Sequence, residues 1–147
     1  MMTLTQSFPD LRFAGAADRF LAECDPKGFN KQMRSRRISW VKIVPLLVSD
    51  AGLGIGEDGN FFIYVDDTLG PKEQALELGH EIAHTFHHNM TKTPPQNFLE
   101  EALKDEVERF CDAFASIWVQ RMGTEALASR FENEADLIFS QGIMQEQ

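Results

Sequence analysis

The strongest helical periodicity in the chain lies between Pro71 and His88. At 100° per residue, one side of such a helix is apolar and the opposite side is polar. The apolar side carries Ala75, Leu78, Ile82 and Phe86, and the polar side carries Glu77, His80, Glu81, His84 and His88. Because Pro71 suits a first turn and residues 72–74 are good helix formers, we predict an amphipathic helix whose apolar side faces the core.

A second helical pattern extends from about Asn97 to Met122. Its apolar positions are Leu99, Leu103, Phe110, Phe114 and Ile117, and its acidic positions are Glu101, Asp105, Glu108 and Asp112. These two sets fall on opposite sides of the predicted helix, so the carboxylates form a row that calls for cations or water. The break at residues 91–95 contains two prolines and permits the chain to turn back between the two helices.

Strands are predicted between these helices and the start of the chain. Residues 38–48 are rich in branched side chains and favour a strand, although Pro45 argues against a central place in a sheet. Residues 52–60 are dense in glycine and other turn formers, and they lead into the strand-like segment Phe61–Val65. We therefore predict a hairpin, in which the glycine run is the connection or a loop that overhangs a cleft.

Two further helices are predicted near the ends of the chain. The first has Asp10 as its cap and ends at Pro26 and Gly28. The last one follows Gly123 and passes through Leu127, Phe131, Leu137 and Ile138. Together the elements predict an α+β fold, with a small twisted β-sheet near the middle of the chain and helices around it.

Composition limits the domain count and the class of partner. With 147 residues and 43% hydrophobic content, the chain can bury one core, so we treat residues 1–147 as a single domain. The formal net charge of −9 argues against direct nucleic-acid binding, which requires clustered Lys and Arg. The one basic cluster is interpreted as a solvated face or a docking patch for an acidic partner, and consists of Lys31, Arg34, Arg36 and Arg37.

The cysteines and the apolar runs indicate the cellular location of the protein. Cys24 and Cys111 lie far apart in a sequence without a signal-peptide-like start, which favours a reducing, cytoplasmic location. The longest apolar stretch, residues 43–48, is far shorter than the roughly 20 residues that a membrane span requires. We predict no membrane association.

The segment His80-Glu81-Ile82-Ala83-His84 carries the candidate chemistry. His80 and His84 are one helical turn apart, so their Cβ atoms lie roughly 5–6 Å from each other and both imidazoles can reach one ion. Hydrolytic zinc sites use three protein ligands and leave one position for water. Glu81 points about 60° away from His84 around the helix, so it is expected to be the general base that touches this water. The alternative for the same residues is a solvated His/Glu face.

A third ligand is needed, and His88 is the first residue to consider. His88 would lie about 12 Å along the helix from His80, too far for all three imidazoles to converge on one ion. The acidic row is the better source. We choose Glu108 because Asp112 follows it at i+4 and can orient a ligating imidazole. Glu101 and Asp105 remain open as alternatives.

The residues resemble the ImmA/IrrE-type zinc metallopeptidases, whose core pattern is a strand, a short loop and a helix bearing H-E-x-G-H-x-x-x-H. The resemblance covers roughly residues 60–120. It includes the segment from Ile63 to His88 and, downstream, Glu108-Arg-Phe-Cys-Asp-Ala-Phe-Ala115. Ala83 stands where the family usually has Gly, Phe110 stands where it often has Glu, and the residues after Ala115 depart from the usual Leu-Leu-Met-Pro ending. The chain is thus similar to a divergent member.

The resemblance implies a zincin-like helix with zinc at His80, His84 and Glu108 and with Glu81 as the catalytic base. It also implies cleavage of a peptide bond in a protein substrate, with a transcriptional regulator or repressor as the expected class. One alternative is a catalytically silent zinc-binding module that sequesters a regulatory protein. Another is a metal-free helical interaction protein.

Overall fold

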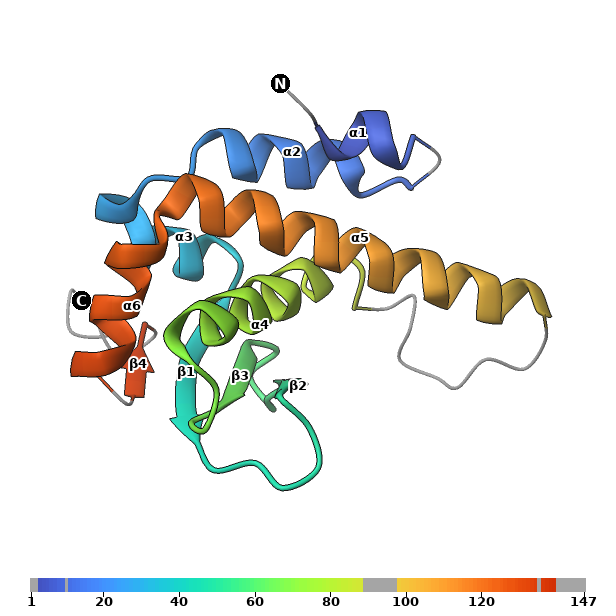
Figure 1. The fold of residues 1–147 in the computed structure, drawn as a ribbon. Coiled ribbons are helices and arrows are strands. Elements are labelled where there is room, and N and C mark those ends of the chain that lie inside the picture. Colours follow the sequence, from blue (N-terminus) through green and yellow to red (C-terminus); the bar gives the residue numbers. More distant parts are fainter. Residues whose placement is uncertain (1–2, 10, 89–97, 135, 140–147) are drawn as a thin grey trace.

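The computed structural model describes residues 3–9, 11–88, 98–134 and 136–139. These residues form a mixed α+β fold with a small, open, four-stranded mixed sheet and six α-helices (Figure 1). The helices are α1 (Leu4–Ser7), α2 (Ala14–Ala22), α3 (Phe29–Ser35), α4 (Pro71–His84), α5 (Phe98–Met122) and α6 (Thr124–Asn133), with a 3₁₀ turn η1 at Pro26–Gly28. The strands are β1 (Ile38–Val44), β2 (Ala51–Ile55), β3 (Phe61–Asp66) and β4 (Asp136–Ile138). The α+β class is confirmed.

The strand order is β2-β3-β1-β4, with β1 and β3 parallel and both outer pairs antiparallel. On β3, Phe61, Ile63 and Val65 are buried, the alternation expected of a strand with one face on the core. The prediction that Pro45 argues against a central place in the sheet is wrong, because β1 lies between β3 and β4. β1 ends at Val44, so Pro45 lies outside the ladder and removes no hydrogen bond from it.

The predicted hairpin is confirmed, because β2 pairs antiparallel with β3. The glycine run, however, is strand rather than connection, and only residues 56–60 form the turn, where Gly59 has a φ of +81°. Gly54 faces the ring of Phe62, and a Cβ on it would lie 2.2 Å from that ring. Glycine is thus required here for close packing and not for flexibility.

Helix α4 lies between the sheet and α5 (Figure 1). Its predicted apolar side is confirmed over Ala75, Leu78 and Ile82, which are fully buried. The helix ends at His84, four residues before the predicted end. There, Thr85 donates its hydroxyl hydrogen to the Ile82 carbonyl, and Arg36 donates to both the Thr85 hydroxyl and the Thr85 carbonyl, each at 3.0 Å. These bonds satisfy carbonyl groups at the helix end.

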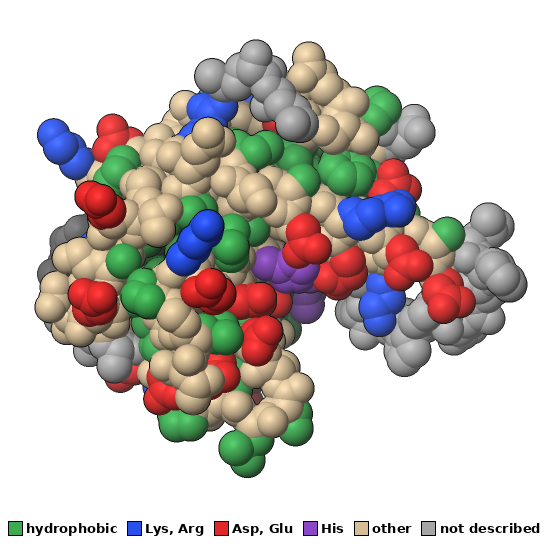
Figure 2. Space-filling view, in the orientation of Figure 1, with side chains coloured by type: hydrophobic (Ala, Val, Ile, Leu, Met, Phe, Trp, Pro, Cys, Tyr) green, Lys and Arg blue, Asp and Glu red, His purple; other side chains and the backbone are tan. Residues whose placement is uncertain are grey.

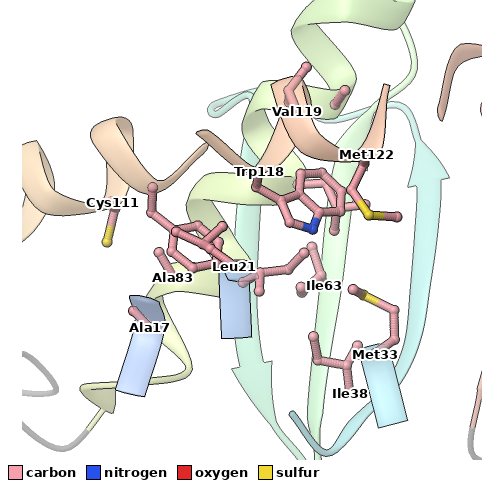
Figure 3. Close-up of a cluster of buried hydrophobic side chains, with 14 of the residues drawn as sticks. Ala17, Leu21, Met33, Ile38, Ile63, Ala83, Cys111, Trp118, Val119 and Met122 are labelled. Atoms are coloured by element: carbon pink, nitrogen blue, oxygen red, sulfur yellow. The ribbon is translucent and has the colours of Figure 1, made fainter. Parts of the chain in front are cut away.

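Helix α5 agrees with the predicted second helix to within one residue at its start. Its buried side chains include Phe110, Phe114, Trp118 and Met122, and they meet side chains from α2, α3, α4 and the sheet in one core (Figure 3). Leu103 and Ile117 pack against this core as expected. The side chain of Leu99 and the proline break at 91–95 lie outside the described residues.

The end of the described chain differs from the prediction. Helix α6 stops at Asn133, and Leu137 and Ile138 belong to β4 instead. β4 pairs antiparallel with β1, opposite Val41, so that Leu137 is buried while Ile138 stays exposed. The partner strand is distant in sequence, so local helical periodicity could not report it. Asp10, the predicted cap of the first helix, lies outside the described residues.

The basic cluster is not a solvated face throughout. Arg36 is half-buried and stacks over the ring of Phe86, with its guanidinium carbon 3.7 Å from the ring centroid. Burial lowers the pKa of Arg36. Among the described helices, none is long and apolar enough to cross a membrane.

Candidate metal centre

A close approach of α4 and α5 brings the candidate residues together. A Cβ on Gly79 would lie 3.0 Å from the Cα of Ala115 and 3.0 Å from the ring of Trp118, so only glycine lets α5 pack this tightly. The two helices run antiparallel, because His80 faces Asp112 whereas His84 faces Glu108. Gly79, which precedes His80, thereby allows the close helix packing that brings His80 to Asp112 and His84 to Glu108.

Three donor groups converge between the helices. His80 Nε2 lies 2.9 Å from Glu108 Oε2, and His84 Nε2 lies 3.3 Å from Glu108 Oε1. The two histidine Nε2 atoms are 3.2 Å apart. In Figure 2, histidine side chains reach the surface on this face, with Asp and Glu side chains gathered around them.

Asp112 holds the other side of the His80 ring. Its Oδ1 lies 2.8 Å from His80 Nδ1, although three quarters of the Asp112 side chain is exposed. A carboxylate in this position favours the tautomer that carries its proton on Nδ1 and leaves Nε2 free to bind. The structure therefore places Asp112 where the sequence analysis expected an orienting carboxylate.

Burial controls the charge of the neighbouring groups. Glu81 is 8% exposed, and this desolvation raises its pKa to about 7, with the charge of His80 opposing the shift. Burial also lowers the pKa of His84, with Glu108 opposing that shift. A carboxyl group whose pKa is raised to about 7 suits a proton acceptor, and a histidine whose pKa is lowered by burial suits a metal ligand.

The donor set fits a small divalent cation. Ligands at about 2.0–2.2 Å in tetrahedral geometry are separated by about 3.3 Å from one another. The two histidine Nε2 atoms are 3.2 Å apart, and each lies 2.9 or 3.3 Å from a different oxygen of Glu108, which is close to this spacing. Two neutral imidazoles and one carboxylate are also ligand types that zinc accepts.

Cys111 is a further candidate ligand that the sequence analysis missed. Its Sγ and nitrogen atoms of His80 and His84 all lie within 4.8 Å of one another, so these three residues could also hold a metal ion. The thiol is buried, which raises its pKa, and it lies 3.3 Å from His87 Nε2. Its spacing of three residues from Glu108, one helical turn, is the sequence signal that could have identified it.

The other sequence candidates lie away from this centre. Glu101 and Asp105 are exposed on α5, and neither contacts His80 or His84 within the described residues. His87 is 3% exposed and packs against Phe13, whereas His88 packs against Phe61. The geometric exclusion of His88 as a ligand therefore agrees with its position, although it stands beyond the end of α4.

Comparison of the chain with protein-family models, with curated proteins and with solved structures finds no match. The resemblance to ImmA/IrrE-type metallopeptidases thus stays a prediction from the motif residues. The structural evidence on function is the arrangement of His80, His84 and Glu108 between α4 and α5.

Proposed function

We propose that this chain is a zinc-dependent endopeptidase, with zinc held by His80, His84 and Glu108 and with Glu81 as the general base. The observation that carries the proposal is the convergence of three side chains, two imidazoles and one carboxylate, with neighbouring donor atoms 2.9–3.3 Å apart. The H-E-x-x-H segment on a buried helix and its resemblance to the ImmA/IrrE-type family support the same assignment.

Glu108 is a better third ligand than Cys111. The Glu108 carboxylate already touches both imidazoles, and its side chain is 43% exposed. Cys111 would have to lose a proton that burial makes harder to remove, since a thiol binds metal only as the thiolate. Of these two ligands, the partly exposed Glu108 leaves the metal centre more accessible to water and substrate than the buried Cys111 does.

When bound, zinc supplies Lewis acidity that activates a water molecule and polarises a carbonyl group. Glu81 accepts the proton of the attacking water as the water oxygen bonds to the carbonyl carbon of the substrate. Glu81 then delivers this proton to the amide nitrogen as the C–N bond breaks, so a carboxylic acid and an amine are formed. Asp112 keeps the His80 ring oriented throughout.

The substrate backbone is expected at β2 and not at β3. β3 is already paired with β1 on one side and with β2 on the other, so no edge of it is open to a peptide. β2 is the edge strand on that side of the sheet and contacts α4. No strand of the described residues pairs with the outer side of β2, so an extended peptide could add to the sheet there. An extended segment of a protein, with a transcriptional regulator as the class that the resemblance implies, is the proposed substrate.

A mixed-sequence library of decapeptides, analysed by mass spectrometry for new termini, tests the proposal. The zinc-loaded chain should generate new termini, and Glu81→Gln should lower this rate by about 10²–10⁴-fold while zinc binding stays intact. Glu77→Gln, one turn earlier on α4, is the matched control and should retain most activity.

The proposal fails if the zinc-loaded chain generates no new termini, or if Glu81→Gln cleaves at the unmodified rate. Capture of one subset of peptides without cleavage, equal in both proteins, would instead favour the zinc-binding module that sequesters its partner.

A further inference from the structure

A second cavity lies beyond the carboxyl-terminal end of α4. Its volume is about 460 Å³, within the roughly 300–1,000 Å³ of small-molecule sites. Residues from three regions form its walls: the segment before α2, the residues that follow α4, and the β2–β3 hairpin with the residue that precedes β1. Neither His80 nor His84 lines this cavity, so it is distinct from the proposed metal centre.

The charge of the cavity is opposite to that of the protein. Arg12 and Arg37 line it together with His88, whereas no Asp or Glu of the described residues does, in a chain with a net charge of −9. Neither arginine forms an ion pair with a carboxylate in the part of the chain that the structure describes. Arg37 donates a hydrogen bond to the Asn60 side chain at 3.2 Å, which fixes its guanidinium against the hairpin. Two guanidinium groups in one cavity provide fork-like donors for an anion.

The remaining walls are largely apolar. Phe13 and Phe61 are buried at the cavity and offer aromatic surface, and Ile55 adds an exposed aliphatic side chain. His87 also lines the cavity, and its buried Nδ1 has no hydrogen-bond partner among the described residues. Ligand pockets combine such apolar walls with a few polar groups that orient the ligand. A buried polar atom at the wall normally requires a partner, either water or a ligand.

We propose that this cavity binds a small organic anion: a carboxylate or phosphate ester attached to an aromatic or aliphatic body. Arg12 and Arg37 take the anionic group, and the phenylalanines take the apolar body. The inference goes beyond the proposed peptidase function and does not depend on it. Because the His87 ring lies 5.0 Å from the His84 ring, a ligand here would nevertheless sit next to the metal centre.

Phenyl phosphate is the probe, and its binding to the full chain is measured by calorimetry and by NMR titration. Saturable binding is expected, with the largest shifts at Arg37, Phe61 and His88. The double variant Arg12→Gln/Arg37→Gln should weaken binding by tenfold or more. The matched control is Arg19→Gln/Arg109→Gln, which removes the same charge at two exposed positions that do not line the cavity, and it should bind within about twofold of the unmodified chain.

Inorganic phosphate and phenol separate the two parts of the ligand, and each alone should bind at least tenfold more weakly than phenyl phosphate. The proposal is overturned if phenyl phosphate does not saturate the protein at millimolar concentration. It is also overturned if the arginine double variant binds as well as the control, since a phosphate bound at the metal centre would behave in that way. Two-dimensional NMR spectra of both double variants establish that each is folded.

Discussion

The contact between α4 and α5 has two regions that differ in what they contribute. In the apolar region, Gly79 meets Ala115 and Trp118 in close contact. In the polar region, His80 and His84 meet Glu108, and a buried carboxyl group lies beside them. Apolar packing stabilises the fold by itself, whereas buried titratable groups cost free energy unless a partner compensates them. The apolar region therefore holds α4 and α5 at the distance at which His80, His84 and Glu108 can form a binding site.

The largest expected effect is on metal affinity, and it comes from the polar region. Glu108→Gln keeps the side-chain volume but removes the ligating charge, so zinc affinity should fall by more than the roughly 10–100-fold that loss of an orienting group costs. Cys111→Ser is the control and should stay within about tenfold of the unmodified protein. Competition with a chelating dye measures both affinities. If the serine variant loses zinc and the glutamine variant keeps it, the ligand set is His80, His84 and Cys111.

In the metal-free protein, the buried carboxyl group of Glu81 should lower the free energy of unfolding when it is charged. Burial raises its pKa from 4.5 to about 7, so the folded chain binds this proton more tightly than the unfolded chain does. The stabilisation from protonation is complete below about pH 4.5 and is lost as the pH rises through about 7. Glu81→Gln should therefore raise the free energy of unfolding at pH 8 by up to roughly 3 kcal/mol.

Denaturant unfolding with chelator present, between pH 5 and pH 8, measures this difference, because a bound cation would lower the same pKa. Glu77→Gln is the matched control. Burial raises the pKa of Glu77 as well, but this residue is less buried, so its gain at pH 8 should be smaller. Equal pH dependence of the Glu81→Gln variant and the unmodified chain would contradict the account of the buried carboxyl group.

The apolar region is tested by Gly79→Ala. The added methyl group would lie 3.0 Å from Ala115 and from Trp118, so the helices must move apart by a few tenths of an ångström, at a cost of about 1–3 kcal/mol in the free energy of unfolding. Zinc affinity should fall together with stability, because the donor groups move apart. Gly52→Ala, where the added Cβ meets nothing, is the control and should change stability by less than about 1 kcal/mol. Unchanged zinc affinity in a destabilised Gly79→Ala protein would show that the two regions are independent.

The smallest expected effect concerns the orientation of one imidazole. Asp112→Asn weakens the hydrogen bond to His80 Nδ1, and zinc affinity should fall by about 10–100-fold. Asp105→Asn removes a similar charge from the same helix without contacting either histidine, and its affinity should stay near the unmodified value. Equal affinities for the two variants would mean that Asp112 is only a surface carboxylate.

The sequence predicted the parts of this arrangement that follow from local periodicity. The apolar side of α4, the length of α5 and the hairpin before α4 could all be predicted, because the apolar residues of each element recur at the period of a helix or a strand. Glu108 could be chosen over Glu101 and Asp105 from its i+4 relation to Asp112, and the structure brings those two residues to His80.

Contacts between distant residues could not be predicted in this way. The early end of α4 depends on Arg36, which lies 49 positions from Thr85. Asp136–Ile138 join β1 as a strand, although the apolar spacing of Leu137 and Ile138 after Phe131 also suits a helix. Cys111 was overlooked because its place beside the histidines depends on the packing of α5 against α4.

Anomalous diffraction at the zinc edge, from crystals grown with zinc and without added chelator, tests the central claim most directly. The account predicts one strong peak at about 2.0–2.2 Å from His80 Nε2, His84 Nε2 and a Glu108 oxygen, with an open position toward solvent. A crystal in which these side chains are ordered but carry no peak, or in which the peak lies elsewhere, would contradict it.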